Sequence, residues 1–555
     1  MPSGRASVRH CLTGKGRQPP PRCAPVAART RFFTTMDSTT GMCAMNFCDF
    51  LLQQPPSLPA LCAGPETVSY AELLSRAAVY QRRLESSGLH TGQRVLLLMT
   101  PGIEFYLLLY AMLGAGLIPV LVQKEMARQQ LRSCLKQARL SAMIVAQSAG
   151  KGWCLLPELW MIRRFTIDTP RIFTAPLAQA EPEGVNTAFR VEALDDEATA
   201  LLTFTSGSTG TPKGVVRSHH SLRAQCQAMS HFFPHRQQRD VTSFPILTLF
   251  SHFHAGCCSL LPGFDEQGRL PVQMIADAIN AQQITRLSVS PAWLRELVAY
   301  AEVQQCTFAS VREVIIGGAP VTRALLLAAR SYFPKAACAV NYGASEADPI
   351  SNVSVDELLD AWERQPGYLV GRPGPQTAIL IARERVPQPV GEEGEILVCG
   401  PQVLTRYLDN PQAEQRTKIR DPEGRVWHRT GDSGFLDAQQ RLWLTGRIAD
   451  QLRTPSGLTL SPYPVEKQLN GLPGIADSAV VQGPQGEICV VLQQAVQCRT
   501  AAPLLATLFP DETVRFWLCE KLPVDARHHS RIDRARLRCL IARRKLKAFF
   551  PEVQG

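Results

Sequence analysis

The sequence lacks any arrangement of cysteines that would support a disulfide framework or a structural zinc site. Its 17 cysteines are odd in number and scattered, and none forms a C-x-x-C pair. Such frameworks and sites depend on paired or regularly spaced cysteines. We therefore expect the cysteines to be reduced and to pack as small hydrophobic side chains, as in a cytoplasmic protein.

The sequence also lacks a hydrophobic run long enough to cross a membrane. Its most apolar stretch, residues 107–122, is interrupted by Pro119 and is shorter than the roughly 20 residues that a membrane-spanning helix needs. The stretch instead predicts a buried helix that leads into a buried strand.

Acidic residues are missing from the start of the chain. Seven Lys and Arg residues precede the first acid, Asp37, and without them the formal charge of +11 falls to +4. This ordinary balance gives no reason to expect a nucleic-acid partner. We expect residues 1–45 to lie outside the fold, as a transit peptide or as a segment before a later start. The proline run at 19–21 favours the later start, because it would interrupt a targeting helix.

Short, continuously apolar runs alternate with helical patterns over most of the chain. Residues 69–88 have apolar side chains at helical spacing. The apolar runs typical of buried strands are residues 94–99, 142–146, 200–205, 286–290, 313–318 and 339–343. This alternation predicts an α/β fold with doubly wound parallel sheets and ligands at the carboxyl ends of the strands.

The pattern changes after about residue 366. Short strand signals separated by Gly, Pro and Asp predict a small barrel-like subdomain over residues 366–447. We expect residues 46–447 to form one large domain and residues 448–555 a small α+β domain.

One loop has the composition of a phosphate-binding loop. Residues 205–214, TSGSTGTPKG, follow an apolar run. Glycines let backbone amides converge, hydroxyl groups add donors and Lys213 adds a positive charge. It is not a Walker A loop, because Pro212 stands where the second glycine would be.

This loop resembles the signature of the acyl-adenylate-forming (AMP-binding) superfamily, which includes acyl-CoA synthetases, luciferases and peptide-synthetase adenylation domains. GGAP at 317–320, NYGASE at 341–346, HRTGD at 428–432 and LTGR at 444–447 follow in the family's order. The resemblance implies an ATP-dependent ligase with Mg²⁺ at Glu346 and with Asp432 and Arg447 on the ribose. It implies nucleotide-binding roles for Thr205, Ser206, Gly207, Ser208, Thr209, Gly210, Lys213, Gly318, Ala319, Pro320, Asn341, Tyr342, Gly343, Ser345, Asp432 and Arg447.

The chain is most similar to a branch of fatty-acid ligases that includes the olefin β-lactone synthetases. The segments that carry this likeness are residues 92–122, 342–351 and 523–532. It implies a hydrophobic acyl substrate and transfer of the acyl group to CoA or to an acyl carrier protein. The alternative is closure by the substrate's own 3-hydroxyl group to a β-lactone.

The catalytic set implied by the resemblance is Lys213, Glu346 and Arg531. Arg531 stands where the family has a lysine; it keeps the charge, but its planar donors are not equivalent to an ammonium group. This departure motivates a further alternative, a non-catalytic nucleotide- or acyl-binding protein. Phe250, His252 and His254 lie where the family places part of the acyl pocket, with ordinary core packing as the alternative.

Overall fold

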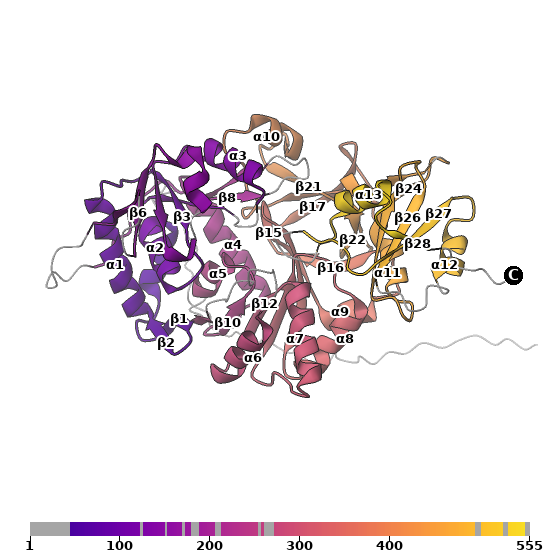
Figure 1. Ribbon diagram of the computed structural model, residues 1–555, viewed down its shortest axis with the longest axis horizontal. Helices are drawn as coiled ribbons and strands as arrows, with labels where there is room; N and C mark the ends of the chain where they lie inside the picture. The colour runs from indigo at the N-terminus through magenta and orange to yellow at the C-terminus, as the bar shows by residue number, and fades with distance from the viewer. Residues whose placement is uncertain are drawn as a thin grey trace, which may run out of the picture. The chain divides into compact units, whose positions relative to one another are not determined.

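The computed structural model describes most of the chain, and every structural statement below concerns those residues (Figure 1). They are residues 45–122, 126–149, 152–168, 173–178, 188–205, 212–253, 257–259, 271–454, 456–493, 501–525 and 531–549. None of their helices is long and apolar enough to cross a membrane.

A seven-stranded sheet forms the first part of the fold, in the order β7-β6-β5-β3-β4-β8-β9. Its strands are β3 (Arg94–Leu98), β4 (Ile118–Leu121), β5 (Ala142–Val145), β6 (Arg163–Thr166), β7 (Ala175–Pro176), β8 (Thr199–Thr205) and β9 (Lys213–Ser218). Every neighbouring pair is parallel except β8 and β9. The strands predicted from the apolar runs are therefore confirmed here.

Both faces of this sheet are covered. The helices around it are α1 (Tyr70–Ser86), α2 (Ile103–Gly114), α3 (Arg128–Ala138) and α4 (His219–Phe232). Helices η1 (Phe47–Gln53) and α5 (Leu247–Phe253) pack against α4, and α5 also packs against β10 and β11 of the second sheet. Val95 and Leu97 of β3 pack in the hydrophobic cluster of α1 and α2, whereas Leu96 packs in the cluster of α3. Because successive side chains of a strand point to opposite faces, this alternation confirms the doubly wound architecture.

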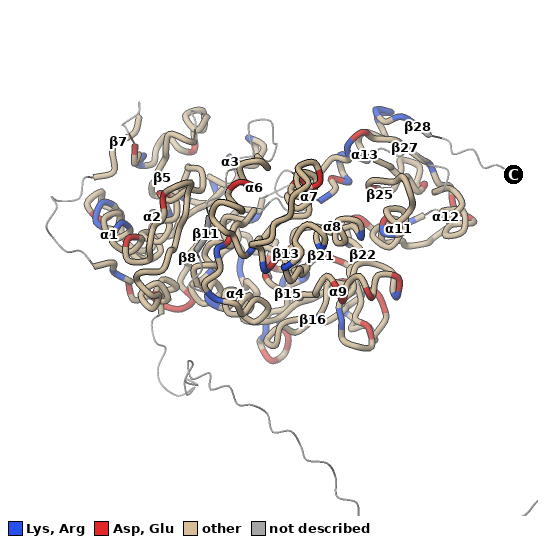
Figure 2. Tube along the Cα trace, turned by 90° about the horizontal axis from the view of Figure 1, so that it is seen from below, with Lys and Arg blue, Asp and Glu red and all other residues tan. Residues whose placement is uncertain are grey.

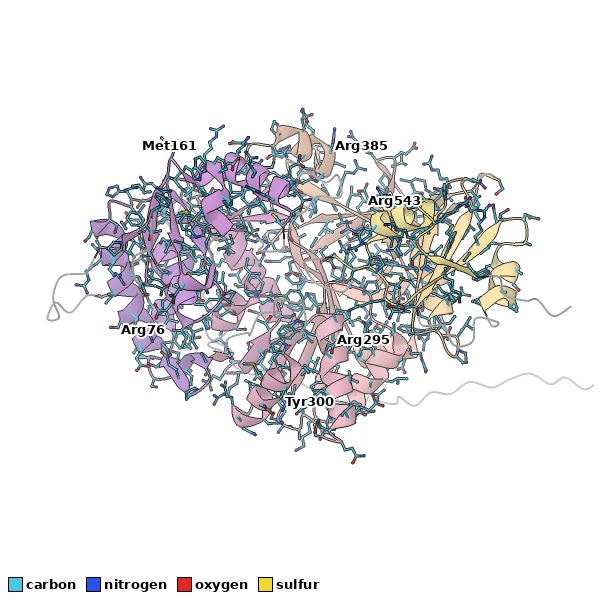
Figure 3. All side chains as sticks on the ribbon, viewed as in Figure 1. Arg76, Met161, Arg295, Tyr300, Arg385 and Arg543 are labelled. Carbon is cyan, nitrogen blue, oxygen red and sulfur yellow. The ribbon has the colours of Figure 1, made fainter. Side chains whose placement is uncertain are left out.

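Helix α1 shows how local sequence sets an element. The Ser69 side chain accepts from the Glu72 amide, and the Glu72 carboxylate accepts from the Ser69 amide. This capping box satisfies two amides that the first turn leaves without partners. Arg76, labelled in Figure 3, lies on the helix surface. It forms ion pairs with Glu66 and Glu104.

A second, fifteen-stranded sheet follows, in the order β18-β17-β19-β21-β22-β16-β15-β14-β13-β12-β10-β11-β1-β2, with β20 paired to β21. Its first strands are β1 (Pro59–Ala63), β2 (Glu66–Ser69), β10 (Arg239–Thr242), β11 (Cys257–Ser259), β12 (Arg286–Val289), β13 (Glu313–Gly317), β14 (Ala337–Ala344) and β15 (Ala347–Ser354). The run from β1 to β14 is parallel. Its helices are α6 (Val272–Ala281), α7 (Pro291–Val303), α8 (Arg323–Tyr332) and α9 (Val355–Asp360).

Antiparallel strands continue this sheet beyond β14. They are β16 (Tyr368–Pro373), β17 (Ala378–Arg383), β18 (Val386–Pro387), β19 (Gly394–Cys399), β20 (Lys418–Arg420), β21 (Val426–Leu436) and β22 (Leu442–Arg447), with α10 (Pro411–Thr417) between β19 and β20. The change from parallel to antiparallel pairing already begins at β15. It therefore precedes the change of texture predicted near residue 366, after which the strand pairs remain antiparallel.

The C-terminal region has an α+β fold, as expected. Its elements are η5 (Ile448–Asp450), β23 (Leu452–Arg453), β24 (Thr459–Leu460), α11 (Pro462–Leu469), β25 (Asp477–Gln482), β26 (Ile488–Gln493), α12 (Ala501–Leu508), β27 (Val514–Cys519), α13 (Arg534–Ala542) and β28 (Lys547–Phe549). A buried ion pair joins α11 to α13, with the Arg534 guanidinium 2.5 and 2.6 Å from the two carboxylate oxygens of Glu466. Basic residues gather at the exposed end of α13 and the start of β28 (Figure 2).

His252 of α5 belongs to the core that joins the two sheets. Its side chain is fully buried; Nε2 donates to the Ala60 carbonyl at 2.7 Å, and Nδ1 lies 2.6 Å from the Tyr110 hydroxyl and accepts from it. Burial lowers the pKa of His252 to about 4, so the ring is neutral at pH 7. Phe250 is buried in the same cluster. These contacts agree with the core alternative for both residues, and His254 lies outside the described residues.

The buried neutral ring of His252 predicts a loss of stability in acid. Because the folded pKa of about 4 lies below the ordinary value of about 6.5, its stabilisation is complete above pH 6.5 and declines as the pH falls towards 4. His252→Gln keeps one donor and one acceptor but does not titrate. Between pH 7 and 5 the wild type should lose about 2 kcal/mol more unfolding free energy than this variant in denaturant titrations. His231→Gln, at an exposed position of α4, serves as the control; a His252→Gln profile parallel to that of the wild type would contradict the assignment.

Candidate active site

The predicted phosphate-binding loop connects β8 and β9 at one edge of the first sheet. Thr205 and Lys213 are paired in register at the ends of these strands, while residues 206–211, with Ser206, Gly207, Ser208, Thr209 and Gly210, lie outside the described residues. Gly214 follows at a point of close contact, because a Cβ atom there would lie 2.8 Å from Cβ of Leu408. The pairing of β8 with β9 therefore holds the two ends of the loop, Thr205 and Lys213, side by side.

Lys213 lies in a compact group of polar side chains. Its ammonium lies 5.4 Å from the centre of the Tyr407 ring, and that of Lys418, from β20, lies 5.5 Å from the same centre. The Tyr407 hydroxyl donates to Oε1 of Glu346 at 2.9 Å. Glu346 stands in the turn between β14 and β15, so the group unites both sheets.

Electrostatics keep Glu346 ionised. Burial alone would raise the pKa of this carboxyl, but His428 in its charged form, Lys418, the Tyr407 hydroxyl and Lys213 hold it below its usual value. Burial lowers the pKa of His428 to about 3, so at neutral pH this ring is uncharged and the lysines supply the positive charge. Burial also lowers the pKa of Lys418 to about 8. The result is a partly buried carboxylate beside two ammonium groups.

The carboxyl ends of β13 and β14 lie side by side next to this group. Gly317 and Asn341 are paired in register, and Gly318 has a φ of +95° that favours glycine. The side-chain oxygen of Asn341 is buried and has no hydrogen-bond partner among the described residues. Such an atom is costly unless a ligand satisfies it. The Asn341 oxygen can therefore accept a hydrogen bond from a bound molecule at this edge. Ala319 and Pro320 follow Gly318 directly at the same edge.

The end of β14 and the turn after it are closely packed. A Cβ atom on Gly343 of β14 would collide with a carboxylate oxygen of Asp348. The Ser345 carbonyl accepts from Arg217 of β9 at 3.0 Å. The backbone of the turn is therefore fixed against the first sheet.

Asp432 and Arg447 form a second polar pair. They face each other in register on β21 and β22, with Nε of Arg447 2.7 Å from Oδ1 of Asp432. The Tyr342 hydroxyl donates to Oδ2 at 2.7 Å. The attraction of Asp432 raises the pKa of Arg447, and Tyr342 and Glu346 add to it. The pair that the sequence separates by 15 positions is thus assembled by a hairpin next to Glu346.

Arg531 of the C-terminal region and Asp432 act electrostatically on the same residue, Tyr463. Its amide donates to a carboxylate oxygen of Asp525 at 3.0 Å, and its Nε is buried without a hydrogen-bond partner among the described residues. Burial raises the pKa of Tyr463 on α11, while Arg534 and Arg531 lower it and Asp432 raises it further. Both Arg531 and Asp432 are therefore within electrostatic range of Tyr463.

Sequence motifs did not reveal Tyr407, Lys418 or Arg217. Tyr407 and Lys418 lie between the recognised segments, in a stretch without a glycine-rich or acidic signature. Their relation to Glu346 comes from strand pairing, since Lys418 pairs with His428 and Tyr407 forms a bridge with Val215. Only the tertiary structure contains this information.

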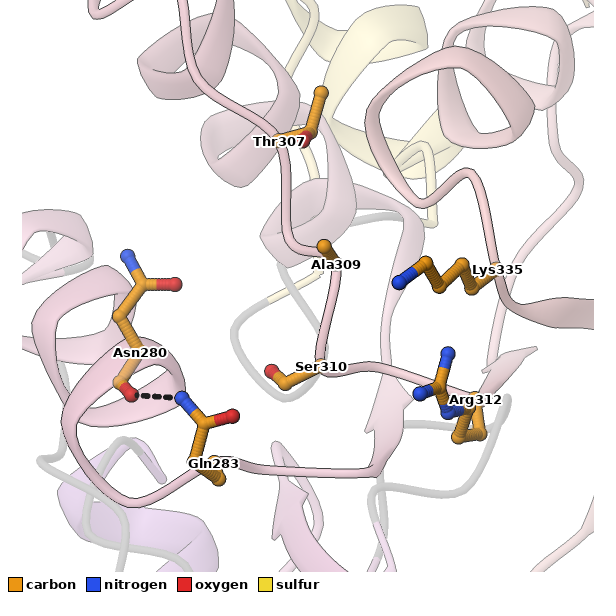
Figure 4. Close-up of a pocket in the computed structure, with 7 residues that line it drawn as sticks. All are labelled: Asn280, Gln283, Thr307, Ala309, Ser310, Arg312 and Lys335. Atoms are coloured by element: carbon orange, nitrogen blue, oxygen red, sulfur yellow. Dashed lines mark hydrogen bonds between the residues drawn. The ribbon is translucent and has the colours of Figure 1, made fainter.

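A separate polar depression of about 330 Å³ lies at the amino ends of β12 and β13, opposite the carboxyl ends that carry the candidate site (Figure 4). Its lining residues are Asn280, Gln283, Thr307, Ala309, Ser310, Arg312 and Lys335. Arg312 precedes β13, and Lys335 follows the carboxyl end of α8. The carboxyl end of a helix carries a partial negative charge, which disfavours the binding of phosphate. Ligands of doubly wound sheets bind at the carboxyl ends of the strands, and this depression lies at their amino ends. The candidate active site is therefore the group at the carboxyl ends of the strands.

Comparisons with known proteins identify the family to which the chain belongs. Residues 50–408 match the family model described as AMP-binding enzyme. The chain is 32% identical to an olefin β-lactone synthetase of Stenotrophomonas maltophilia (strain K279a), over 86% of this chain and 92% of that protein. It is 26% identical to a 4-coumarate-CoA ligase of Narcissus pseudonarcissus, over 79% of this chain and 81% of the relative.

Solved structures share the fold. The amide bond synthetase McbA of Marinactinospora thermotolerans superimposes with a TM-score of 0.77 at 22% identity, over 89% of this chain and 98% of that one. An o-succinylbenzoate CoA synthetase of Bacillus subtilis, in complex with ATP and a magnesium ion, gives a TM-score of 0.72 at 21% identity, over 89% and 99%. With its family model, its relatives and this fold, the chain belongs to the AMP-binding enzyme family and is an adenylate-forming ligase.

Proposed function

We propose that the protein uses ATP and Mg²⁺ to activate a hydrophobic carboxylic acid, such as a fatty acid, as an acyl-adenylate with release of pyrophosphate. The observation that carries this proposal is the ionised Glu346 beside Lys213 and Lys418, next to the Asp432–Arg447 pair. Cations near a carboxylate suit a magnesium polyphosphate, and the carboxylate–guanidinium pair suits the two vicinal hydroxyls of a ribose.

Each part of the nucleotide has candidate partners. The loop from Thr205 to Gly210 and Lys213 would hold the phosphates, and Asp432 with Arg447 the ribose. Gly318, Ala319, Pro320, Tyr342, Gly343 and Ser345 would form the walls around the base. The unsatisfied oxygen of Asn341 would accept from the amino group of adenine.

Glu346 fits a magnesium site of the kind that nucleotides complete. Among the described residues no group of three or more His, Cys, Asp or Glu side chains could hold a metal. Mg²⁺ in nucleotide sites needs only one or two carboxylates, because phosphate oxygens and water fill its other positions. Bound there, the ion would neutralise charge on the leaving pyrophosphate.

The chemistry of the first step requires alignment more than proton transfer. A carboxylate oxygen of the substrate attacks the α-phosphorus of ATP, and the bond from that phosphorus to the oxygen bridging to the β-phosphate breaks. Pyrophosphate leaves with the electron pair, and no proton is transferred. The residues therefore act by holding the two anions together and compensating their charge.

For the second step, the likeness to a β-lactone synthetase supports ring closure. That relative shares more identity and coverage with this chain than the 4-coumarate-CoA ligase does. The 3-hydroxyl oxygen of the substrate attacks the acyl carbon, AMP leaves, and the hydroxyl proton passes to solvent. Transfer to the thiol of CoA or of an acyl carrier protein is the other candidate, supported by the likeness to CoA ligases.

We further propose that residues 46–447 form the nucleotide-binding domain, with the barrel-like part at 366–447, and that residues 448–555 form a mobile domain. The short helix η5 and the exposed Ala449 stand at the junction. For the location, we propose the cytoplasm, because eleven cysteines of the described residues are free.

Removing the charge of Asp432 tests the ribose assignment. Asp432→Asn keeps the shape of the side chain but weakens its hydrogen bonds to the hydroxyls, so kcat/KM for ATP should fall about tenfold to a hundredfold. Asp360→Asn, at an exposed position, is the matched control. Steady-state release of pyrophosphate measures both, and an unchanged kcat/KM in Asp432→Asn would remove this residue from the site.

Substitution of Arg531 tests whether the protein is an enzyme or only binds its ligands. Arg531→Ala should slow pyrophosphate release about a hundredfold, whereas Arg531→Lys should stay within about tenfold of the wild type. Lys521→Ala tests the alternative cation and should have little effect. An inactive wild type that gains strong activity in Arg531→Lys would instead support the non-catalytic alternative.

The product identifies the acceptor. Incubation of the protein with ATP, Mg²⁺ and a 3-hydroxy fatty acid should give AMP and a β-lactone in the absence of any thiol, as detected by mass spectrometry. A parallel reaction with CoA is the comparison. Formation of acyl-CoA only, with no lactone in either tube, would overturn ring closure and leave adenylation intact.

A further inference from the structure

We infer that Lys418 is a positioning residue of the nucleotide site, which fixes Glu346 through Tyr407 and through the backbone of Leu404. The inference rests on the proposed function, because it assumes that Glu346 faces magnesium and ATP. It assigns a role to a lysine that none of the sequence motifs includes.

Two routes lead from Lys418 to Glu346. In the first, its ammonium lies over the ring of Tyr407, whose hydroxyl donates to the Glu346 carboxylate at 2.9 Å. In the second, the ammonium donates to the Leu404 carbonyl, and the Leu404 amide donates to the Glu346 carbonyl at 2.8 Å. Lys418 thus holds both the side chain and the backbone of Glu346.

The charge of Lys418 has no direct acidic partner among the described residues. No carboxylate oxygen of these residues lies within ion-pair distance of its ammonium, although Glu346 and Glu414 act on it from further away. A partly buried ammonium without such a contact is costly for the fold alone. A hydrophobic side chain would fill the same space without the desolvation cost of an ammonium group. Packing alone therefore does not explain why a lysine stands at position 418.

Two cations that converge on one aromatic ring also repel each other. The ammonium groups of Lys213 and Lys418 lie 5.4 and 5.5 Å from the centre of the Tyr407 ring. Glu346 compensates one of these charges. A bound polyphosphate compensates the remaining charge, so the arrangement is most stable with the nucleotide in place.

Binding measurements without turnover test this role. In titration calorimetry with MgATP and no acid substrate, Lys418→Met should weaken binding about tenfold, and Lys418→Arg should recover most of the affinity, because it restores the cation over the ring. Lys335→Met, at an exposed lysine, should bind as the wild type does. Melting temperatures establish that each variant is folded.

A double-mutant cycle distinguishes positioning from a structural role. Tyr407→Phe removes the hydroxyl that links Lys418 to Glu346, so adding Lys418→Met to it should weaken MgATP binding by less than Lys418→Met does alone. Independent, multiplicative losses, or wild-type affinity in Lys418→Met, would overturn the inference. Absence of MgATP binding by the wild type would instead contradict the proposed function.

Discussion

The proposed active site depends on keeping a partly buried carboxylate charged. Glu346 lies where burial alone would favour the neutral acid, and nearby cations and the Tyr407 hydroxyl reverse that preference. The cations come from β9 and β20, which are distant in the sequence. A charged carboxylate that is partly shielded from water interacts strongly with a hard cation, whereas a protonated one does not. The proposed roles of Lys213, Lys418 and Tyr407 follow from this requirement.

The topology of the fold brings these groups together. The hairpin of β8 and β9 presents Lys213, the adjacent ends of β13 and β14 present Gly318 and Asn341, and the hairpin of β21 and β22 presents Asp432 and Arg447. In doubly wound sheets the carboxyl ends of parallel strands form a common edge. The antiparallel extension places a second polar pair, Asp432 and Arg447, next to this edge. In the proposed function, this pair would bind the ribose and the edge would bind the base.

Much of this could be predicted from the sequence, for identifiable reasons. Strands such as β3 and β5 are short apolar runs, because parallel strands are buried on both faces, and the α1 helix has apolar side chains at helical spacing. Lys418 and Tyr407 were missed because their proximity to Glu346 depends on strand register. His252 was ambiguous, since a histidine in an apolar segment gives no sign of whether both ring nitrogens are satisfied; in the structure both are.

The most direct test of the account is acid-dependent exchange of labelled pyrophosphate into ATP, measured with a panel of fatty, 3-hydroxy fatty, aromatic and amino acids. This exchange reports formation of the acyl-adenylate whatever the final acceptor is. The account predicts Mg²⁺-dependent exchange that is fastest with a fatty or 3-hydroxy fatty acid. Absence of exchange with every acid, from a folded protein, would contradict it.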